Sequence, residues 1–219
     1  MRFTLYFDGK LPSSAGESRL EDKHEIREKL HWQILQLFRT YRSLPKPNGK
    51  DWAGWSTWQW PNLIIDEQYG IGMGWKEGIG WTERDAVVQV GDLHFLPLVR
   101  SSLDLVCELD VLFLRPGAPG LMERGTHYDI DNRLLTLFDG LTVPVGEKQE
   151  AYAIAHTRLD RNSPIFCLLG DDSRITAINV RTDSLLAAAE GARPDHVRLI
   201  IGVTLRAVRT GFHNLTLAE

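Results

Sequence analysis

Hydrophobic and polar residues alternate, or recur at helical spacing, over most of this chain. The N-terminal stretch RFTLYFDGKLP alternates and ends in a Pro-Ser turn, which predicts a first β-strand. From Asp22 to about Tyr41 the apolar residues recur every three or four positions, as on the buried face of a helix. That apolar stripe consists of Ile26, Leu30, Ile34, Leu37 and Phe38. The first forty residues therefore predict one strand followed by one long helix.

The second half of the chain shows the same two periods. Two apolar runs, HFLPLVRSS and LDLVCELDVLFLRP, are separated by a turn and predict an antiparallel hairpin. PGAPG then leads to DIDNRLLTLFDGL, whose apolar residues at spacings of three and four predict a second helix. The polar stretch from Thr142 to Pro164 predicts a loop. PIFCLLG, RITAINVRTD and VRLIIGVTLRAV predict three further strands, and SLLAAAE predicts a short helix before the last of them.

This order of elements indicates an α+β fold. Strands grouped with two to three packed helices, without regular βαβ alternation, favour a mainly antiparallel or mixed sheet. Residues 1–219 are expected to form a single domain that contains a Trp/Gly/Pro-rich insertion over residues 44–82. The tryptophans of the insertion either pack over the core, which is the favoured interpretation, or form a platform for unstacked bases. They are Trp52, Trp55, Trp58, Trp60, Trp75 and Trp81.

Composition restricts the class of protein. Hydrophobic residues make up 43% of the chain and charged residues 25%, which is typical of soluble globular proteins. The N-terminus lacks a signal-peptide pattern, and no apolar stretch approaches the length of a membrane span, so a cytoplasmic location is expected. Cys107 and Cys167 lie in apolar runs and are expected to be buried thiols rather than a disulfide.

The charge balance favours a nucleic-acid partner only locally. The formal net charge is -4, whereas phosphate contacts normally come from clustered lysine and arginine. Two segments are locally basic, and a solvated surface of mixed charge explains them as well as a nucleic-acid contact does. The first contains Lys23, Arg27, Lys29, Arg39, Arg42, Lys46 and Lys50, and the second contains Arg193, Arg198, Arg206 and Arg209.

Carboxylates at two places could hold a divalent cation. Asp129 and Asp131 are two positions apart, so an extended chain would present both side chains on one side, next to a helix N-terminus. Asp171 and Asp172 follow the strand PIFCLLG. Carboxylate oxygens are ligands that suit Mg²⁺ or Mn²⁺. Asp and Asn also cap helices and form turns, so a purely structural role is the alternative.

The order of these motifs resembles the RusA-type Holliday junction resolvases and their phage-borne relatives. The shared features are DIDN, an amphipathic helix ending in FDGL, an apolar strand, and DD followed by S-x-I. The resemblance implies a RusA-like fold and a homodimer that uses Mg²⁺, or Mn²⁺, to hydrolyse phosphodiesters in branched DNA during recombination and repair. It implies that Asp129, Asp131 and Asp172 bind the catalytic metal. Supporting positions are Asn132, Asp139, Asp171 and Arg133.

One position departs from the resemblance. The motif usually carries a lysine four residues after its second aspartate, and this chain has Leu135 there, on the polar face of the predicted helix with Asn132 and Asp139. Loss of a cation that stabilises a reacting phosphoryl group costs about 10²-fold to 10³-fold in rate. Arg133 points elsewhere on that helix. The alternatives are therefore a non-catalytic or weakened member that binds branched DNA or another partner without cleaving it, and an unrelated protein whose DxDN is only a cap.

Overall fold

A computed structural model describes most of the chain. The described residues are 1–11, 19–41, 63–66, 70–73, 87–116, 130–161, 163–186, 195–210, 214 and 217. Among these residues, none of the helices combines the length and the apolar character that crossing a membrane requires.

The main sheet has four strands in the order β1-β9-β6-β8. They are β1 (Arg2–Lys10), β9 (His196–Ala207), β6 (Leu105–Arg115) and β8 (Ile175–Ser184). β1 and β6 both run antiparallel to β9, whereas β8 runs parallel to β6 and forms one edge. Successive residues of a strand point to opposite faces, and along β6 and β9 one set is buried while the other is half-buried or exposed. The sheet therefore has one apolar face and one polar face.

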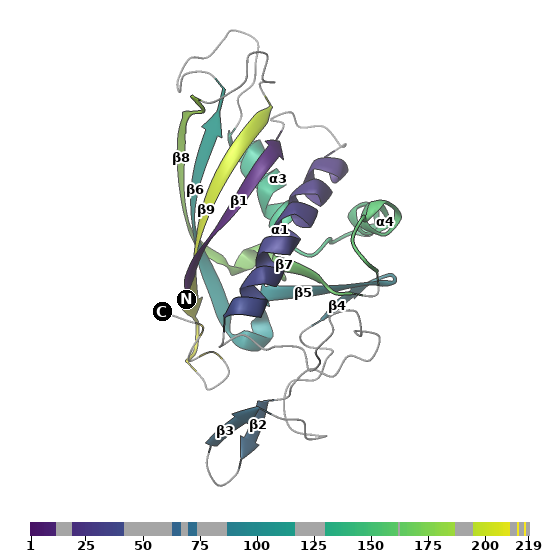
Figure 1. The fold of residues 1–219 in the computed structure, drawn as a ribbon, viewed down its shortest axis with the longest axis vertical. Coiled ribbons are helices and arrows are strands. Elements are labelled where there is room, and N and C mark those ends of the chain that lie inside the picture. The colour runs from purple at the N-terminus through teal and green to yellow at the C-terminus, as the bar shows by residue number, and fades with distance from the viewer. Residues whose placement is uncertain are drawn as a thin grey trace.

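Helices cover the apolar face. α1 (Leu20–Thr40) and α3 (Ile130–Leu141) lie on the same side of the sheet, and α4 (Glu147–His156) lies farther out (Figure 1). A second sheet contains β4 (Val88–Val90), β5 (Leu93–Val99) and β7 (Ile165–Leu169), with β5 and β7 parallel. Two 3-10 turns, η2 (Ser101–Leu103) and η3 (Asp172–Arg174), precede β6 and β8 respectively. β2 (Leu63–Asp66) and β3 (Gly70–Met73) form a separate antiparallel pair.

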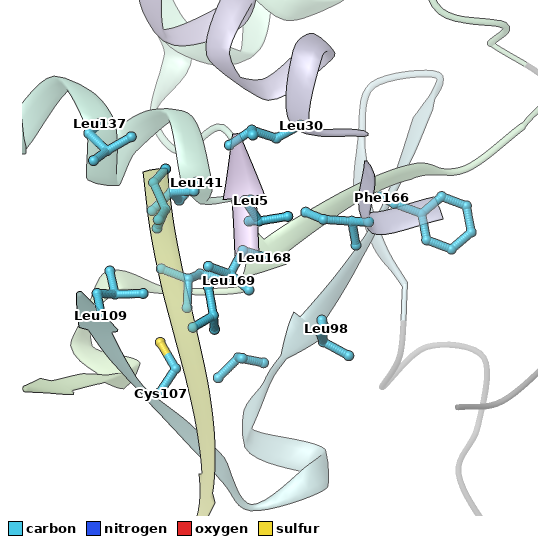
Figure 2. Packing of buried hydrophobic residues seen from close by; sticks show 14 of the residues in the cluster. Leu5, Leu30, Leu98, Cys107, Leu109, Leu137, Leu141, Phe166, Leu168 and Leu169 are labelled. Carbon is cyan, nitrogen blue, oxygen red and sulfur yellow. The ribbon is translucent and has the colours of Figure 1, made fainter. Parts of the chain in front are cut away.

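The core joins both sheets to the helices. Figure 2 shows Leu5 of β1, Leu30 of α1 and Leu137 of α3 in one cluster with the leucines of β7. All five residues of β7 are buried, which matches its continuous apolar sequence. Because β7 lies inside this cluster, the chain that leaves it at Gly170 is held firmly where it emerges at the surface.

Several expectations from the sequence are confirmed. The α+β class with packed helices, the first strand, the long first helix and the amphipathic second helix are all present. Both cysteines are buried and free, and burial raises the pKa of Cys107 and of Cys167 to about 12. The strands predicted around DDSRIT flank η3 as expected. The main error concerns how strands were paired.

Three expectations are wrong. β5 and β6 belong to different sheets, because β5 pairs with β4 and β7, so the predicted hairpin does not form. The stretch predicted as a loop from Thr142 contains α4, whose short helix buries little apolar surface and so left no clear period. Ser184 ends β8 instead of starting a helix, and residues 187–190 lie outside the described residues. The six tryptophans of the expected insertion also lie outside them.

α1 and α3 pack side by side in the same direction. The buried Arg27 guanidinium of α1 donates to the carbonyl oxygens of Asp139 at 2.6 Å and Thr142 at 2.8 Å. These carbonyl groups lie at the C-terminal end of α3, where a helix provides no further N–H groups to bond them. Burial lowers the pKa of Arg27 to about 10, so the side chain stays charged at neutral pH. At the other end, Arg19 donates to the carbonyl oxygen of Asn132 at 2.7 Å. These bonds hold both ends of α3 against α1 and the residue that precedes it.

Gly140 is the closest point between the two helices. A Cβ atom at Gly140 would lie 2.7 Å from two side-chain carbons of Ile26. We expect Gly140→Val to lower the free energy of unfolding by about 2 to 3 kcal/mol, because overpacking forces helix α3 away from α1. Urea unfolding measures the change. Gly202→Ala, whose new Cβ would lie 3.5 Å from its neighbours, is the control, and an equal loss in both variants would contradict the account.

His31 gives the fold a pH dependence. Its Nδ1 accepts a hydrogen bond from the backbone N–H of Phe166 at 2.9 Å, and burial lowers the pKa of His31 from 6.5 to about 4. The unfolded chain binds the proton first, so this stabilisation is complete above pH 6.5 and is lost as the pH falls towards 4. The loss amounts to about 3 kcal/mol.

The measurement is urea unfolding at several pH values between 7 and 4, for the wild type and for His31→Gln. The glutamine side chain keeps an acceptor oxygen but cannot take up a proton in this range. We expect the variant to lose less stability than the wild type on acidification. Equal losses would assign the pH dependence to other groups.

Candidate functional site

Asp131 lies in the first turn of α3. The helix begins at Ile130, so Asp131 is already helical, not extended as the sequence suggested, and Asp129 lies outside the described residues. The Asp131 side chain is exposed, and its Oδ1 accepts a hydrogen bond from the Asn132 N–H at 2.9 Å. A carboxylate in a first turn interacts favourably with the helix dipole. This arrangement serves helix capping, and it also leaves an outward carboxylate oxygen for a ligand.

The other residues of α3 have distinct roles. The Asp139 carboxylate pairs with Lys23 of α1 at 2.6 Å, so it contributes to helix packing. The Asn132 carbonyl oxygen accepts hydrogen bonds from Arg19 and from the Thr136 hydroxyl. Leu135 is 58% exposed, which confirms its position on the polar face. Asp139 is therefore held apart from Asp131 by its own partner.

Two arginines line a pocket next to the start of α3. The pocket has a volume of about 190 Å³ and is lined by Phe113, Arg115, Ile130, Arg133 and Thr182. Arg133 is only 6% exposed, because it points from α3 towards the sheet. This volume is below the range of about 300 to 1,000 Å³ that drug-sized ligands occupy, so the pocket suits a small anionic group. The first turn of α3, which carries Asp131, therefore also contributes to a pocket lined by two arginines.

Arg115 was not recognised in the sequence. It is the last residue of β6 and lies two positions after the buried Phe113, on the same face of the strand. The available signal was an arginine at a position where the alternating pattern requires an apolar residue. The sequence does not show that α3 lies over the end of β6, so it could not indicate that Arg115 lines a pocket with Arg133.

Asp171 and Asp172 follow the buried strand β7. The Asp171 Oδ1 accepts a hydrogen bond from the Ser173 N–H at 2.8 Å, and the hydrogen bonds from Ser173 lower the pKa of Asp171. Asp171 is thus the N-cap of η3. Asp172 is the first residue of η3, and its side chain is exposed. The pair therefore divides into a capping carboxylate and an outward carboxylate.

Asp131 and Asp172 lie at opposite ends of β8. η3 directly precedes Ile175, which pairs with Cys107 near the start of β6. The first turn of α3 instead lies by Thr182, seven positions farther along β8. At about 3.3 Å per residue, these seven positions span about 23 Å. Within one chain the structure therefore does not bring Asp131 and Asp172 together.

The described side chains of one chain do not form a complete metal-binding site. No three side chains of the types His, Cys, Asp and Glu converge there in a way that could hold a metal ion. Mg²⁺ is bound through one or two carboxylates together with waters and substrate phosphates, so the two outward carboxylates have the right chemistry but the wrong separation. Of the predicted set, Asp131 and Asp172 therefore do not hold one metal together within this chain, and Asp129 lies outside the described residues.

A larger cavity of about 310 Å³ lies elsewhere, between the end of β1 and the start of α1. Its lining carries four carboxylates, those of Asp8, Glu21, Asp22 and Glu25, together with Lys10, Lys29 and His196, and some of these groups form ion pairs. Lys29 pairs with Glu25 at 2.5 Å, and His196 pairs with Asp8 at 2.7 Å. The same Asp8 carboxylate accepts from Arg198 at 2.8 Å. The two ion pairs of Asp8 therefore join the end of β1 to the start of β9.

Comparison with known proteins adds no further constraint. No protein-family model, no curated protein and no solved structure matches the chain. The resemblance to RusA-type resolvases therefore rests on the order and spacing of the DIDN and DDS motifs alone.

Proposed function

We propose that the protein is a Mg²⁺-dependent endonuclease that hydrolyses phosphodiesters in branched DNA in the cytoplasm, as its resemblance to Holliday junction resolvases implies. The observation that supports this function best is the position of Asp131. Its exposed carboxylate lies in the first turn of α3, and Ile130 and Arg133 of the same helical end line a small pocket together with Arg115. Carboxylates bind divalent cations and guanidinium groups bind phosphate, so both parts of a phosphodiester site lie at one end of α3.

The residues of this chain have separate roles in the proposal. Asp131 contributes a carboxylate from the first turn of α3, and Asp129, which precedes the helix in the sequence, is the second carboxylate of the proposed set; Mg²⁺ or Mn²⁺ held by them would activate a water for attack on phosphorus. Arg115 and Arg133 hold the phosphate group and take over the charge that a lysine at position 135 would supply. Asp172 is too far away to join them within the same chain.

A second candidate function is binding of branched DNA without cleavage. The separation of Asp131 from Asp172 favours it, because one chain then lacks a complete set of ligands. The exposed Leu135 favours it as well, since no cation extends from that position. The two functions differ in a single observable, which is whether bound DNA is cut.

Cleavage of a labelled synthetic four-way junction tests the proposal. The wild-type protein is incubated with the junction or with a linear duplex of the same sequence, in Mg²⁺ or in EDTA, and binding is measured in parallel by mobility shift. We expect paired nicks in the junction that require Mg²⁺ and are scarce in the duplex. Binding without nicks would establish the second candidate, and neither binding nor nicks would overturn both.

A further inference from the structure

The pocket at the start of α3 has a buried inner end and an exposed mouth. We call it the arginine pocket, and it is lined by Phe113, Arg115, Ile130, Arg133 and Thr182. Phe113 and Arg133 are buried and form its inner end, whereas Ile130 and Thr182 are exposed and form its mouth. A group that enters the pocket between these two exposed side chains therefore approaches a guanidinium.

Three elements of the fold supply hydrogen-bond donors to the arginine pocket. Thr182 of β8 lies opposite Phe113 of β6, and Arg115 lies two positions farther along β6 on the same face of the sheet. Arg133 reaches the pocket from α3, three positions after Ile130 and on the same side of that helix. Each guanidinium has five N–H donors, so it can hold a ligand in addition to its contacts within the protein.

These donors fit a phosphate monoester better than a phosphodiester. A phosphodiester within a DNA strand carries one negative charge and two oxygens outside the ester bonds. A phosphate monoester carries about 1.5 to 2 negative charges at neutral pH and three such oxygens. The guanidinium groups of Arg115 and Arg133 match the charge of the monoester, and the Thr182 hydroxyl is a donor from a third element.

Hydrolysis of a strand converts a phosphodiester into a phosphate monoester. The oxygen of the attacking water bonds to phosphorus, the ester bond to the leaving oxygen breaks, and one water proton goes to the leaving oxygen. The other proton is released to solvent at neutral pH, because the second pKa of a phosphate monoester is about 6. The phosphate thereby gains an oxygen and a negative charge, so the product fits the arginine pocket better than the substrate does.

We propose that the arginine pocket retains the phosphate at the end of the strand that the protein has cut, and that release of this end limits turnover. The proposal rests on the proposed function for the origin of the strand end. Binding of a phosphate monoester follows from the donors and charges of the pocket alone, so it is measurable without metal and without cleavage.

Fluorescence polarisation of a labelled hexathymidylate in EDTA tests the monoester site. The oligonucleotide carries a phosphate at its 5′ end, at its 3′ end or at neither end, with the dye at an unphosphorylated end. We expect one phosphorylated form to bind about tenfold more tightly than its unphosphorylated match, the effect of one charge-assisted hydrogen bond. Inorganic phosphate, added as an unlabelled competitor, is expected to displace it only at higher concentration than the phosphorylated oligonucleotide does.

Thr182→Val and Arg115→Gln are the test variants, and Arg181→Gln is the control. Valine is β-branched like threonine, and position 182 is exposed, so loss of the hydroxyl leaves the strand intact if Arg115→Gln disturbs folding. We expect both test variants to lower the tenfold preference for the phosphorylated end. Arg181→Gln is expected to keep it, because Arg181 pairs with Asp110 on the opposite face of the sheet.

Three results would each overturn the inference. They are equal binding of phosphorylated and unphosphorylated oligonucleotides, equal competition by inorganic phosphate and by the phosphorylated strand, and an unchanged preference in Thr182→Val and Arg115→Gln. If the wild type cuts junctions, its first turnover is expected to be faster than later ones, and equal rates would overturn the claim about release. A preference for the phosphorylated end in a protein that cuts no junction would instead overturn the proposed function and leave the monoester site in place.

Discussion

Asp131→Asn reduces junction cleavage by about 10²-fold to 10³-fold or more, the loss expected when a group that organises transition-state charge is removed. The Asp131 side chain is exposed, so the free energy of unfolding is expected to change little. Asparagine also caps a helix about as well as aspartate. The measurement is the single-turnover cleavage rate, with urea unfolding of the variant in parallel.

Asp139→Asn is the matched control for this substitution. It removes one carboxylate from the same helix, but this carboxylate pairs with Lys23. A partly exposed ion pair contributes about 0 to 1 kcal/mol, so a small loss of stability with retained cleavage is expected. If Asp139→Asn lowers cleavage as much as Asp131→Asn, the assignment of Asp139 to helix packing is contradicted.

Arg115→Gln is expected to reduce cleavage by on the order of 10²-fold, because a guanidinium at the phosphate is replaced by a neutral amide. Binding should also weaken for all DNA sequences, and the slope of log K against log salt concentration should fall by about one. Mobility shifts between low and moderate salt measure this slope. Arg133 is less suitable for the test, because its side chain is buried between α3 and the sheet, and its loss would disturb the packing of the helix.

Arg181→Gln changes the net charge by the same amount away from the pocket. Arg181 lies on β8 and pairs with Asp110 on the polar face of the sheet at 3.3 Å. We expect it to leave the cleavage rate and the salt slope close to those of the wild type. Equal effects of the two substitutions would show that overall charge, not the pocket, determines phosphate binding.

The sequence predicted those elements whose periodicity arises from burial on one face. β1, α1, α3 and β9 each alternate or repeat against the same apolar layer, so their patterns were unambiguous. α4 was missed because only Ala153 is buried in it, which leaves the helix without an apolar stripe. Local pattern thus identified elements that pack against the core and failed for one that barely contacts it.

Strand pairing could not be predicted from the same information. β5 and β6 are adjacent in sequence and both apolar, but η2 and the left-handed Asp104, with φ 49°, redirect the chain between them into another sheet. The separation of Asp131 from Asp172 depends on this topology, because the parallel pairing of β6 and β8 decides which end of α3 lies by η3. The sequence motifs therefore identified the residue types of the candidate site, but they did not reveal the distance between Asp131 and Asp172.

Cleavage of the labelled four-way junction by the wild type and by Asp131→Asn, each in Mg²⁺ and in EDTA, tests the central claim most directly. We expect nicks that the wild type makes only in Mg²⁺ and that Asp131→Asn does not make, although the variant still binds the junction. Equal cleavage by both proteins, or cleavage in EDTA, would contradict the proposed role of Asp131.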